Sequence, residues 1–309
     1  MSVIKKWALA TFLLCFAVII AGGVVRTTQS GMGCPDWPKC FGKWIPPTNA
    51  SELPADFEKY LSKQDIDHTF NAWHTWIEYV NRLLGVLLGL FALIQVALLI
   101  RYRKNNLLAF RTAIAFLVTV ILTGLFGAIV VKYNLAHLSI SIHLFFAILL
   151  VQIQLALVLI LRKRFQLVPI AAVSKKQLFF FLALLLFHSA MGTVVRMHVD
   201  DISKMLNYAQ RDLWLEALPL SFLIHRSFSW GLLIGGIWVL WRNRNVKALF
   251  TQFKWLGVTL LLNMTVGIIL YYADMPYWAQ PAHLLLAAVA ITQTMALLLQ
   301  TKRNPLSKV

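Results

Sequence analysis

The sequence predicts an all-α integral membrane protein with eight transmembrane helices, arranged as two tandem, related four-helix bundles. Three observations predict this fold class. Hydrophobic residues make up 59% of the 309 residues, charged residues only 13%, and the mean hydropathy is +0.70, whereas about a quarter of a soluble domain is charged. Eight stretches reach the roughly 20 apolar residues that are needed to cross a bilayer. Motifs of the first four stretches return in the same order in the last four.

The eight spans divide into two equal halves. The predicted spans are 7–26, 73–100, 111–131, 138–161, 177–196, 219–241, 252–272 and 280–300. Four spans return the chain to its starting side, so both halves have the same orientation. We expect an N-terminal bundle over 1–165 and a C-terminal bundle over 166–309. The first apolar run follows Lys5 and Lys6 as a secretory signal would, but it is longer than a signal core, so we expect it to be retained.

The net charge of +17 is explained by membrane topology and predicts no nucleic-acid partner. With both termini in the cytoplasm, the cytoplasmic segments carry most of the 29 Lys and Arg and none of the 12 Asp and Glu. This asymmetry is the positive-inside distribution of multi-pass proteins. We therefore expect a multi-pass protein of the bacterial cytoplasmic (inner) membrane, surrounded by membrane lipid, with apolar outer faces that permit a homo-oligomer.

The internal repeat is carried by motifs at the outer ends of the helices. Each half has a Val-Val-Arg helix end, then a residue followed by arginine, then a histidine that opens a later helix. The matched positions are Arg26 and Arg196, Asn81-Arg82 and His225-Arg226, and His143 and His283. The second half has two histidines where the first has an asparagine and one histidine. This difference is the main functional clue.

The histidine pair of the second half indicates a haem site. Ionisable residues in membrane helices usually have a function, and His225 and His283 are expected to face each other across a four-helix bundle. Two neutral imidazoles on opposite faces of an iron porphyrin give a six-coordinate b-type haem suited to electron transfer. The alternative is a pair of hydrogen-bonded histidines in a polar interior.

Four arginines at the same outer level are candidate partners for haem propionates. They are Arg26, Arg82, Arg196 and Arg226. A guanidinium binds a carboxylate in bidentate fashion. The alternative is an arginine that reaches to the membrane interface, and it applies more to Arg26 and Arg196 than to the other two.

The first half predicts a haem with an open iron face at His143, because the amide of Asn81 is a poor iron ligand. Glu78 lies on the same helical face as Asn81. It either relays protons and stabilises positive charge at that face, or pairs with Arg82 one turn away. His74, one turn before Glu78, either supplies the missing iron ligand or simply lies at the membrane interface. The remaining histidines match no repeat position and are predicted to be loop or interface residues: His68, His137, His188 and His198.

A predicted outer loop over 27–72 is the only sizeable segment outside the membrane, and short helices are expected around 51–63. Cys34 and Cys40 lie in this loop. The outer side is oxidising, which favours a disulfide. A metal-binding pair or two redox-active thiols are the alternatives. The sequence lacks Cys-x-x-Cys-His, so covalent haem attachment is not indicated.

At these residues the sequence resembles the haem A synthase family. The resemblance is carried by the string from Gly22 to Cys40, Gly-Gly-Val-Val-Arg-x-Thr-x-Ser-Gly-x-x-Cys-Pro-Asp-Trp-Pro-x-Cys, by Glu-x-x-x-Arg at Glu78, and by the paired histidines. It implies a membrane oxidoreductase that converts the C8 methyl group of haem O to a formyl group in two steps. Haem O synthase (protohaem farnesyltransferase) and terminal oxidase assembly are the implied functional partners.

The resemblance also implies roles for individual residues. The cofactor haem b would be held in the second half by His225 and His283, and the haem O substrate in the first half near His143. Glu78 matches the essential acid of the family, and the cysteine pair matches its outer-loop disulfide. The family pattern in the second helix is Glu-x-x-His-Arg, and this chain departs from it at Asn81.

Two other functions compete with this interpretation. A di-haem b-type cytochrome that exchanges electrons with quinone needs two bis-histidine haems, and Asn81 argues against it. A membrane transporter predicts polar residues near the middle of the bilayer. Here the polar residues gather at the outer ends of the helices.

Overall fold

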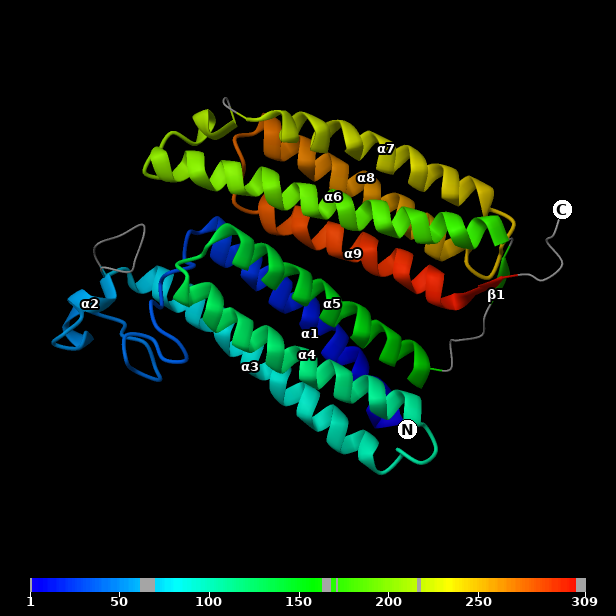
Figure 1. Ribbon diagram of the computed structural model, residues 1–309, viewed down its shortest axis with the longest axis horizontal. Coiled ribbons are helices and arrows are strands. Elements are labelled where there is room, and N and C mark those ends of the chain that lie inside the picture. The colour runs from blue at the N-terminus through cyan, green and yellow to red at the C-terminus, as the bar shows by residue number, and fades with distance from the viewer. Residues whose placement is uncertain (1, 62–69, 163–167, 171, 216–217, 304–309) are drawn as a thin grey trace. The chain divides into compact units, whose positions relative to one another are not determined.

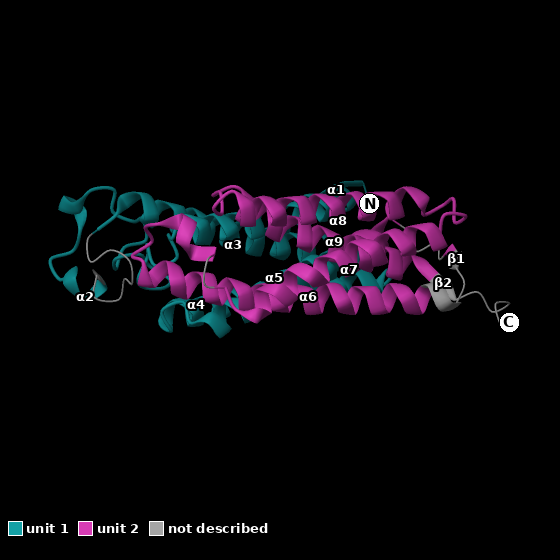
Figure 2. Ribbon diagram, turned by 90° about the horizontal axis from the view of Figure 1, so that it is seen from above, with its two compact units in different colours: residues 1–157 teal, residues 158–309 magenta. Residues whose placement is uncertain are grey.

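The structure is a computed structural model that describes residues 2–61, 70–162, 168–170, 172–215 and 218–303. Within these residues, eight helices are long and apolar enough to cross a membrane, as the sequence predicts. The chain forms two compact units, residues 1–157 and 158–309 (Figure 2).

The first unit is built from four long helices and the outer loop (Figure 1). The long helices are α1 (Ser2–Thr27), α3 (Ala72–Ile100), α4 (Leu107–Lys132) and α5 (His137–Leu161), whose last turn passes into the second unit. Helix α3 packs along α1 on one side and along α4 on the other. The helices follow from long apolar runs with few breaks, and each ends where charged or turn residues begin.

A buried amide cluster ties α5 to α1 and α3. The Gln95 and Gln154 side chains donate to each other's oxygens at 3.0 and 2.7 Å, and Gln154 also donates to the carbonyl oxygen of Ala8 at 2.9 Å. Both glutamines are fully buried. Since no water reaches them, these mutual bonds satisfy groups that would otherwise be costly to bury.

The second unit is a closed ring of four helices. Its elements are β1 (Val168–Ile170), α6 (Ala172–Met205), η2 (Arg211–Leu215), α7 (Leu220–Arg242), α8 (Phe250–Tyr272), α9 (Ala279–Gln300) and β2 (Thr301–Arg303). Helix α6 packs along α7, α7 along α8, α8 along α9, and α9 along α6. Helices α7 and α9 are therefore diagonal to each other in the ring. The strands β1 and β2 pair in parallel, with Val168 opposite Thr301.

Two features of the second unit differ from the prediction. The structure contains the short strand pair β1–β2, which the all-helical prediction did not include. Helix α6 continues to Met205, beyond the predicted end at residue 196. Its apolar run stops there, but Arg196 and Asp200 lie one turn apart with Nε and Oδ2 at 3.6 Å. Such a pair supports further helix in polar surroundings.

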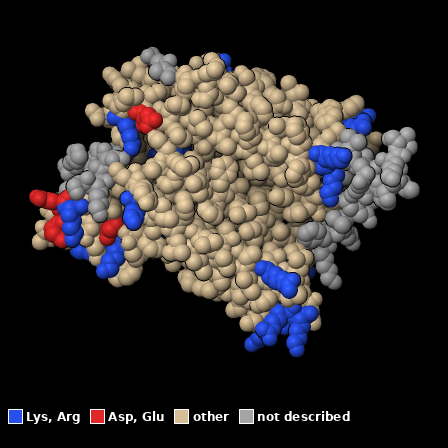
Figure 3. Space-filling model, in the orientation of Figure 1, with Lys and Arg blue, Asp and Glu red and all other residues tan. Residues whose placement is uncertain are grey.

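The outer surface of the long helices suits lipid. Large aliphatic side chains such as Leu90, Ile121 and Ile234 are at least half exposed. In the face drawn in Figure 3, charged side chains gather at the ends of the helices, and the surface between them is uncharged. Mid-helix surfaces of this kind are expected where a protein contacts hydrocarbon.

The outer loop has an aromatic centre of its own. It contains the short helices η1 (Ala50–Glu52) and α2 (Glu58–Leu61), which match the predicted short helices as far as residue 61; residues 62–69 lie outside the described residues. Phe41 is fully buried, and Tyr60 and Phe70 meet its ring edge-on at 5.8 and 5.7 Å. Edge-to-face aromatic contacts of this kind stabilise small clusters.

Candidate functional site

The start of helix α3 is fixed by a side-chain cap. Asn71 Oδ1 accepts hydrogen bonds from the backbone N–H groups of Trp73 (3.0 Å) and His74 (3.2 Å). Capping satisfies donors that the first helical turn leaves without partners. Thr75, Glu78 and Arg82 then follow at spacings of three and four, which places them on one face of α3.

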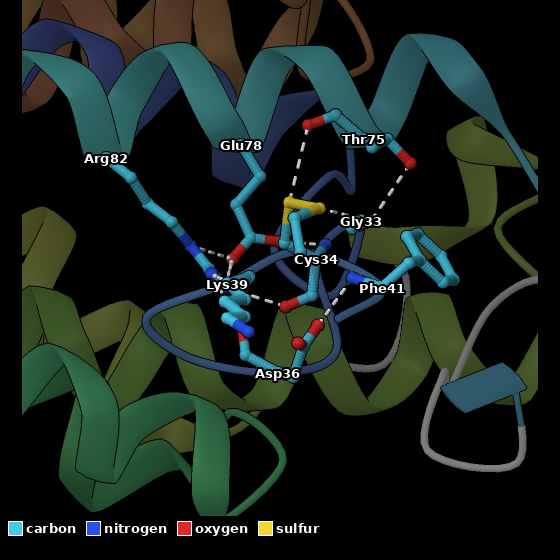
Figure 4. Close-up of polar contacts among 9 residues, drawn as sticks. Gly33, Cys34, Asp36, Lys39, Phe41, Thr75, Glu78 and Arg82 are labelled. Carbon is cyan, nitrogen blue, oxygen red and sulfur yellow. Dashed lines mark hydrogen bonds and ion pairs between the residues drawn. A yellow bond between two sulfur atoms is a disulfide. The ribbon is translucent and has the colours of Figure 1, made fainter. Parts of the chain in front are cut away.

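The loop backbone lies directly on this face. Cys34 and Cys40 form a disulfide, which confirms the predicted pairing, and both are fully buried. A Cβ atom on Gly33 would lie 2.3 Å from the backbone oxygen of His74, and Thr75 Oγ1 donates to the Gly33 carbonyl oxygen at 2.9 Å. We call Gly33, Cys34, Thr75, Glu78 and Arg82 the loop clamp (Figure 4).

The Glu78 carboxylate is the centre of the loop clamp. One oxygen accepts the backbone N–H of Cys34 at 2.7 Å, and the other accepts Arg82 Nε at 3.0 Å and a second bond from Arg82 Nη2. Only 4% of Glu78 is exposed. The ion pair with Arg82 that the sequence offered as one role of Glu78 is present, and it joins the helix to the disulfide loop.

Arg82 uses all its donors inside the protein. Nη1 donates to the carbonyl oxygens of Asp36 (2.6 Å) and Lys39 (3.0 Å), and Nη2 donates to that of Cys34 (2.6 Å). With the two bonds to Glu78, the five N–H groups of the guanidinium are all engaged. In this structure Arg82 anchors the loop, and its role as a propionate partner stays a prediction.

Replacing Gly33 by alanine is therefore expected to destabilise the protein by about 1–3 kcal/mol. The new Cβ would overlap backbone of α3, which cannot move away without breaking the Asn71 cap and the Thr75 bond. The measurement is thermal unfolding of the purified protein, followed by tryptophan fluorescence. Gly31→Ala is the matched control, since its Cβ meets only the end of the flexible Leu135 side chain at 2.9 Å. Equal melting temperatures for both variants would contradict the close approach.

Each of the three candidate iron ligands lies beside a glycine of a neighbouring helix. A Cβ on Gly192 of α6 would lie 3.2 Å from Cε1 of His225, and a Cβ on Gly267 of α8 would lie 3.2 Å from Cε1 of His283. The corresponding distance from Gly127 of α4 to His143 is 3.5 Å. A Cβ on Gly192 or Gly267 would be close enough to press on its imidazole, whereas a Cβ on Gly127 would make an ordinary van der Waals contact with His143.

The first unit lacks one of these contacts. Gly22 occupies the position matched to Gly192, and a Cβ there would meet nothing within 4 Å. Its expected partner is Asn81, which stands where the second unit has His225 and which is half-buried. The open space at Gly22 fits the absence of an imidazole at residue 81.

The hydrogen bonding of His283 suits metal ligation. Its Nδ1 lies 3.1 Å from the backbone oxygen of Asn263. A carbonyl only accepts, so Nδ1 carries the proton and Nε2 keeps its lone pair. Ligating histidines are commonly oriented in this way. His225 lies on the diagonal helix, and its buried Nδ1 has no hydrogen-bond partner among the described residues. Two seated imidazoles on diagonal helices fit a haem iron between them.

The chain matches a family model along nearly its whole length. Residues 5–295 match the COX15-CtaA family model, described as cytochrome oxidase assembly protein. The chain belongs to this family. Proteins named "Heme A synthase" are among its relatives: those of Bartonella quintana (strain Toulouse) and Bartonella bacilliformis are 37% and 34% identical over 98 and 102 residues. One from Cereibacter sphaeroides (strain KD131) is 35% identical over 95 residues.

These alignments are partial. They cover 29%, 31% and 28% of this chain. The chain in turn spans 27%, 28% and 24% of the length of these relatives. The family model extends over both units, so the assignment of the whole chain to the cytochrome oxidase assembly proteins depends on that match.

The other predicted residues of this chain lie at the expected helix ends. Arg26 is in the last turn of α1, and Arg196 lies near Asp200 on α6. Arg226 is exposed on α7, with its guanidinium carbon 5.8 Å from the ring centres of Phe222 and Tyr271. His74 lies in the first turn of α3.

One histidine was predicted wrongly. His188 is buried in α6, where its ring stacks on that of His225, so it is neither a loop nor an interface residue. The signal that could have revealed it is its position four residues before Gly192, on the same helical face. His137 opens α5, His198 is exposed on α6, and His68 lies outside the described residues.

Proposed function

We propose that this member of the COX15-CtaA family converts haem O to haem A by oxidising the C8 methyl group to a formyl group in two steps. The observation that carries the proposal is the family match over both units together with relatives named "Heme A synthase". The site residues support it, because the two units offer unlike environments for a porphyrin.

The second unit would hold haem b as its cofactor, with His225 and His283 as axial ligands. A bound haem b supplies one-electron transfer. The residues hold and orient it. Gly192 and Gly267 set the positions of the imidazoles, and the carbonyl of Asn263 fixes the tautomer of His283. Arg196 and Arg226 are the propionate partners on this side.

The first unit would bind the haem O substrate. His143 is the ligand to its iron, with Arg26 as a propionate partner. The amide of Asn81 and the space at Gly22 leave the other iron face accessible, with His74 as a second candidate ligand. Glu78 acts as the acid of this site, and it also holds the loop clamp in place. A di-haem cytochrome is disfavoured because one imidazole is missing.

The setting of the reaction follows from the same proposal. We infer a tandem duplication, with both termini and the basic connections in the cytoplasm of a bacterial cell and the loop clamp on the outer side. The enzyme that makes haem O supplies the substrate. Terminal oxidase assembly consumes the product.

The proposal is tested by co-expressing the full chain with a haem O-making enzyme in cells that lack haem A, and by analysing the extracted haems. We expect haem A with the wild-type chain and none with His143→Ala, which should keep haem b. His198→Ala, at an exposed position on α6, is the control and should behave as wild type. Haem A absent with the wild-type chain, or formed normally by His143→Ala, would contradict the proposal.

A further inference from the structure

A second histidine lies against the candidate haem b ligand of α7. The rings of His188 and His225 are parallel within 4°, and their centres are 4.0 Å apart. His188 is 8% exposed and comes from the neighbouring helix α6. The function proposed above gives this residue no role, and a buried polar side chain in a membrane helix normally has one.

Hydrogen bonds define the direction of the His188 ring. Its Nε2 lies 3.1 Å from the backbone oxygen of His225 and 3.2 Å from Ser229 Oγ. Ser229 Oγ in turn donates to the same backbone oxygen at 3.0 Å. The carbonyl only accepts, so Nε2 of His188 carries the proton and donates to both oxygens. The ring therefore points at the backbone of α7, and its Nε2 is taken up by these two oxygens.

These contacts confine the His225 imidazole between two parts of α6. The ring of His188 stacks on it, and one turn later lies Gly192, where an added Cβ would be 3.2 Å from its Cε1. A ligand ring held in this way cannot rotate freely about the bond that joins it to its helix. The backbone at residue 225 is held as well, through the bonds of His188 and Ser229 to its carbonyl.

The first half of the sequence has no counterpart of the His225 imidazole, of the His188 ring or of the Ser229 hydroxyl. Counting from the matched glycines, Val18 corresponds to His188. Counting from the matched Asn81 and His225, Gly85 corresponds to Ser229. The half with an imidazole on its second helix thus also has the stacked histidine and the serine, and the half without that imidazole has neither. This pattern ties His188 and Ser229 to the presence of His225.

We propose that His188 is a positioning residue for haem b: it sets the plane of the His225 imidazole, and Ser229 supports it. This inference rests on the function proposed above, in which His225 binds haem b. In a low-spin ferric haem, the angle between the two axial imidazole planes determines the spread of the g values. The surroundings of a ligand also influence the reduction potential of the haem, through solvent access and local dielectric.

The test compares His188→Ala with His188→Phe in the full chain purified with its haem. We expect His188→Ala to retain low-spin haem b, with a shifted and broadened largest g value in electron paramagnetic resonance. Its midpoint potential should fall, because water near the ligand favours the more charged ferric form. His188→Phe keeps a ring on His225 and should stay close to the wild-type g values. Ser229→Ala should shift them in the same direction as His188→Ala, but by less.

His198→Ala, elsewhere on α6, is the matched control and should leave both signals unchanged. Wild-type g values and midpoint potential in His188→Ala would overturn the positioning role. If His188→Ala does not fold, shifted g values in Ser229→Ala together with wild-type g values in His188→Phe would support the positioning role. Unchanged signals in both variants, or changed signals in His188→Phe, would overturn it. Failure of the proposed function is distinguishable, because the wild-type protein would then either lack the low-spin signal or make no haem A in co-expressing cells.

Discussion

Replacing Glu78 by alanine is expected to abolish haem A formation and to loosen the outer loop at the same time. The change leaves the Cys34 N–H and two N–H groups of Arg82 without their acceptor. Removing one partner of a largely buried ion pair costs about 3–5 kcal/mol. The measurements are haem A in membrane extracts and the rate at which a water-soluble reductant opens the Cys34–Cys40 disulfide. We expect a faster opening.

Glu78→Gln separates the two roles of this residue. Glutamine keeps the length of the side chain and one oxygen as acceptor for Arg82, but its NH2 group then faces the Cys34 N–H. The disulfide should therefore open faster than in the wild type but more slowly than in Glu78→Ala. Glutamine cannot take up or release a proton, and loss of an acid or base typically costs on the order of 10²–10⁴-fold in rate. We therefore expect little haem A from Glu78→Gln, although its disulfide should open more slowly than that of Glu78→Ala.

Glu52→Ala is the control for removing a loop carboxylate. Glu52 accepts the Thr48 N–H at 2.8 Å, and this bond holds its pKa below the ordinary value, but the residue is exposed and outside the loop clamp. Normal haem A is expected. If Glu78→Gln also made normal haem A, Glu78 would have a structural role only and would not act as an acid in the reaction.

The second large effect is expected from His225→Ala and His283→Ala. Each removes one of two imidazoles on diagonal helices of the second unit, and a bis-histidine haem cannot remain six-coordinate with one ligand. The low-spin haem b signal should disappear from the absorption spectrum of either purified variant. His143→Ala removes a histidine of the first unit that also lies beside a glycine of a neighbouring helix, and it should retain that signal. A low-spin signal that survives in both His225→Ala and His283→Ala would place the haem elsewhere.

Much of the fold could be predicted because lipid restricts the choices. Long apolar runs must be helices, so the eight spans follow from hydropathy alone. The end of α6 could not be read in this way, since beyond residue 196 the helix depends on polar pairs such as Arg196 and Asp200. The strand pair β1–β2 joins residues 168–170 and 301–303, and no local pattern shows such a distant pairing.

The candidate site was only partly predictable. The Cys34–Cys40 disulfide and the pairing of Glu78 with Arg82 follow from the loop composition and helix periodicity. The loop clamp could not be predicted, because it depends on where the loop backbone packs on α3. That packing places three backbone carbonyl groups around Arg82. His188 escaped prediction because a buried histidine with no counterpart in the other half resembles an isolated polar residue.

The most direct test is the haem content and absorption spectrum of the wild-type protein, purified in full from cells that make haem O. The account predicts two unlike porphyrins: a low-spin haem b that depends on His225 and His283, and a second haem that depends on His143. A colourless protein without any tetrapyrrole would contradict it, and so would two identical bis-histidine haems.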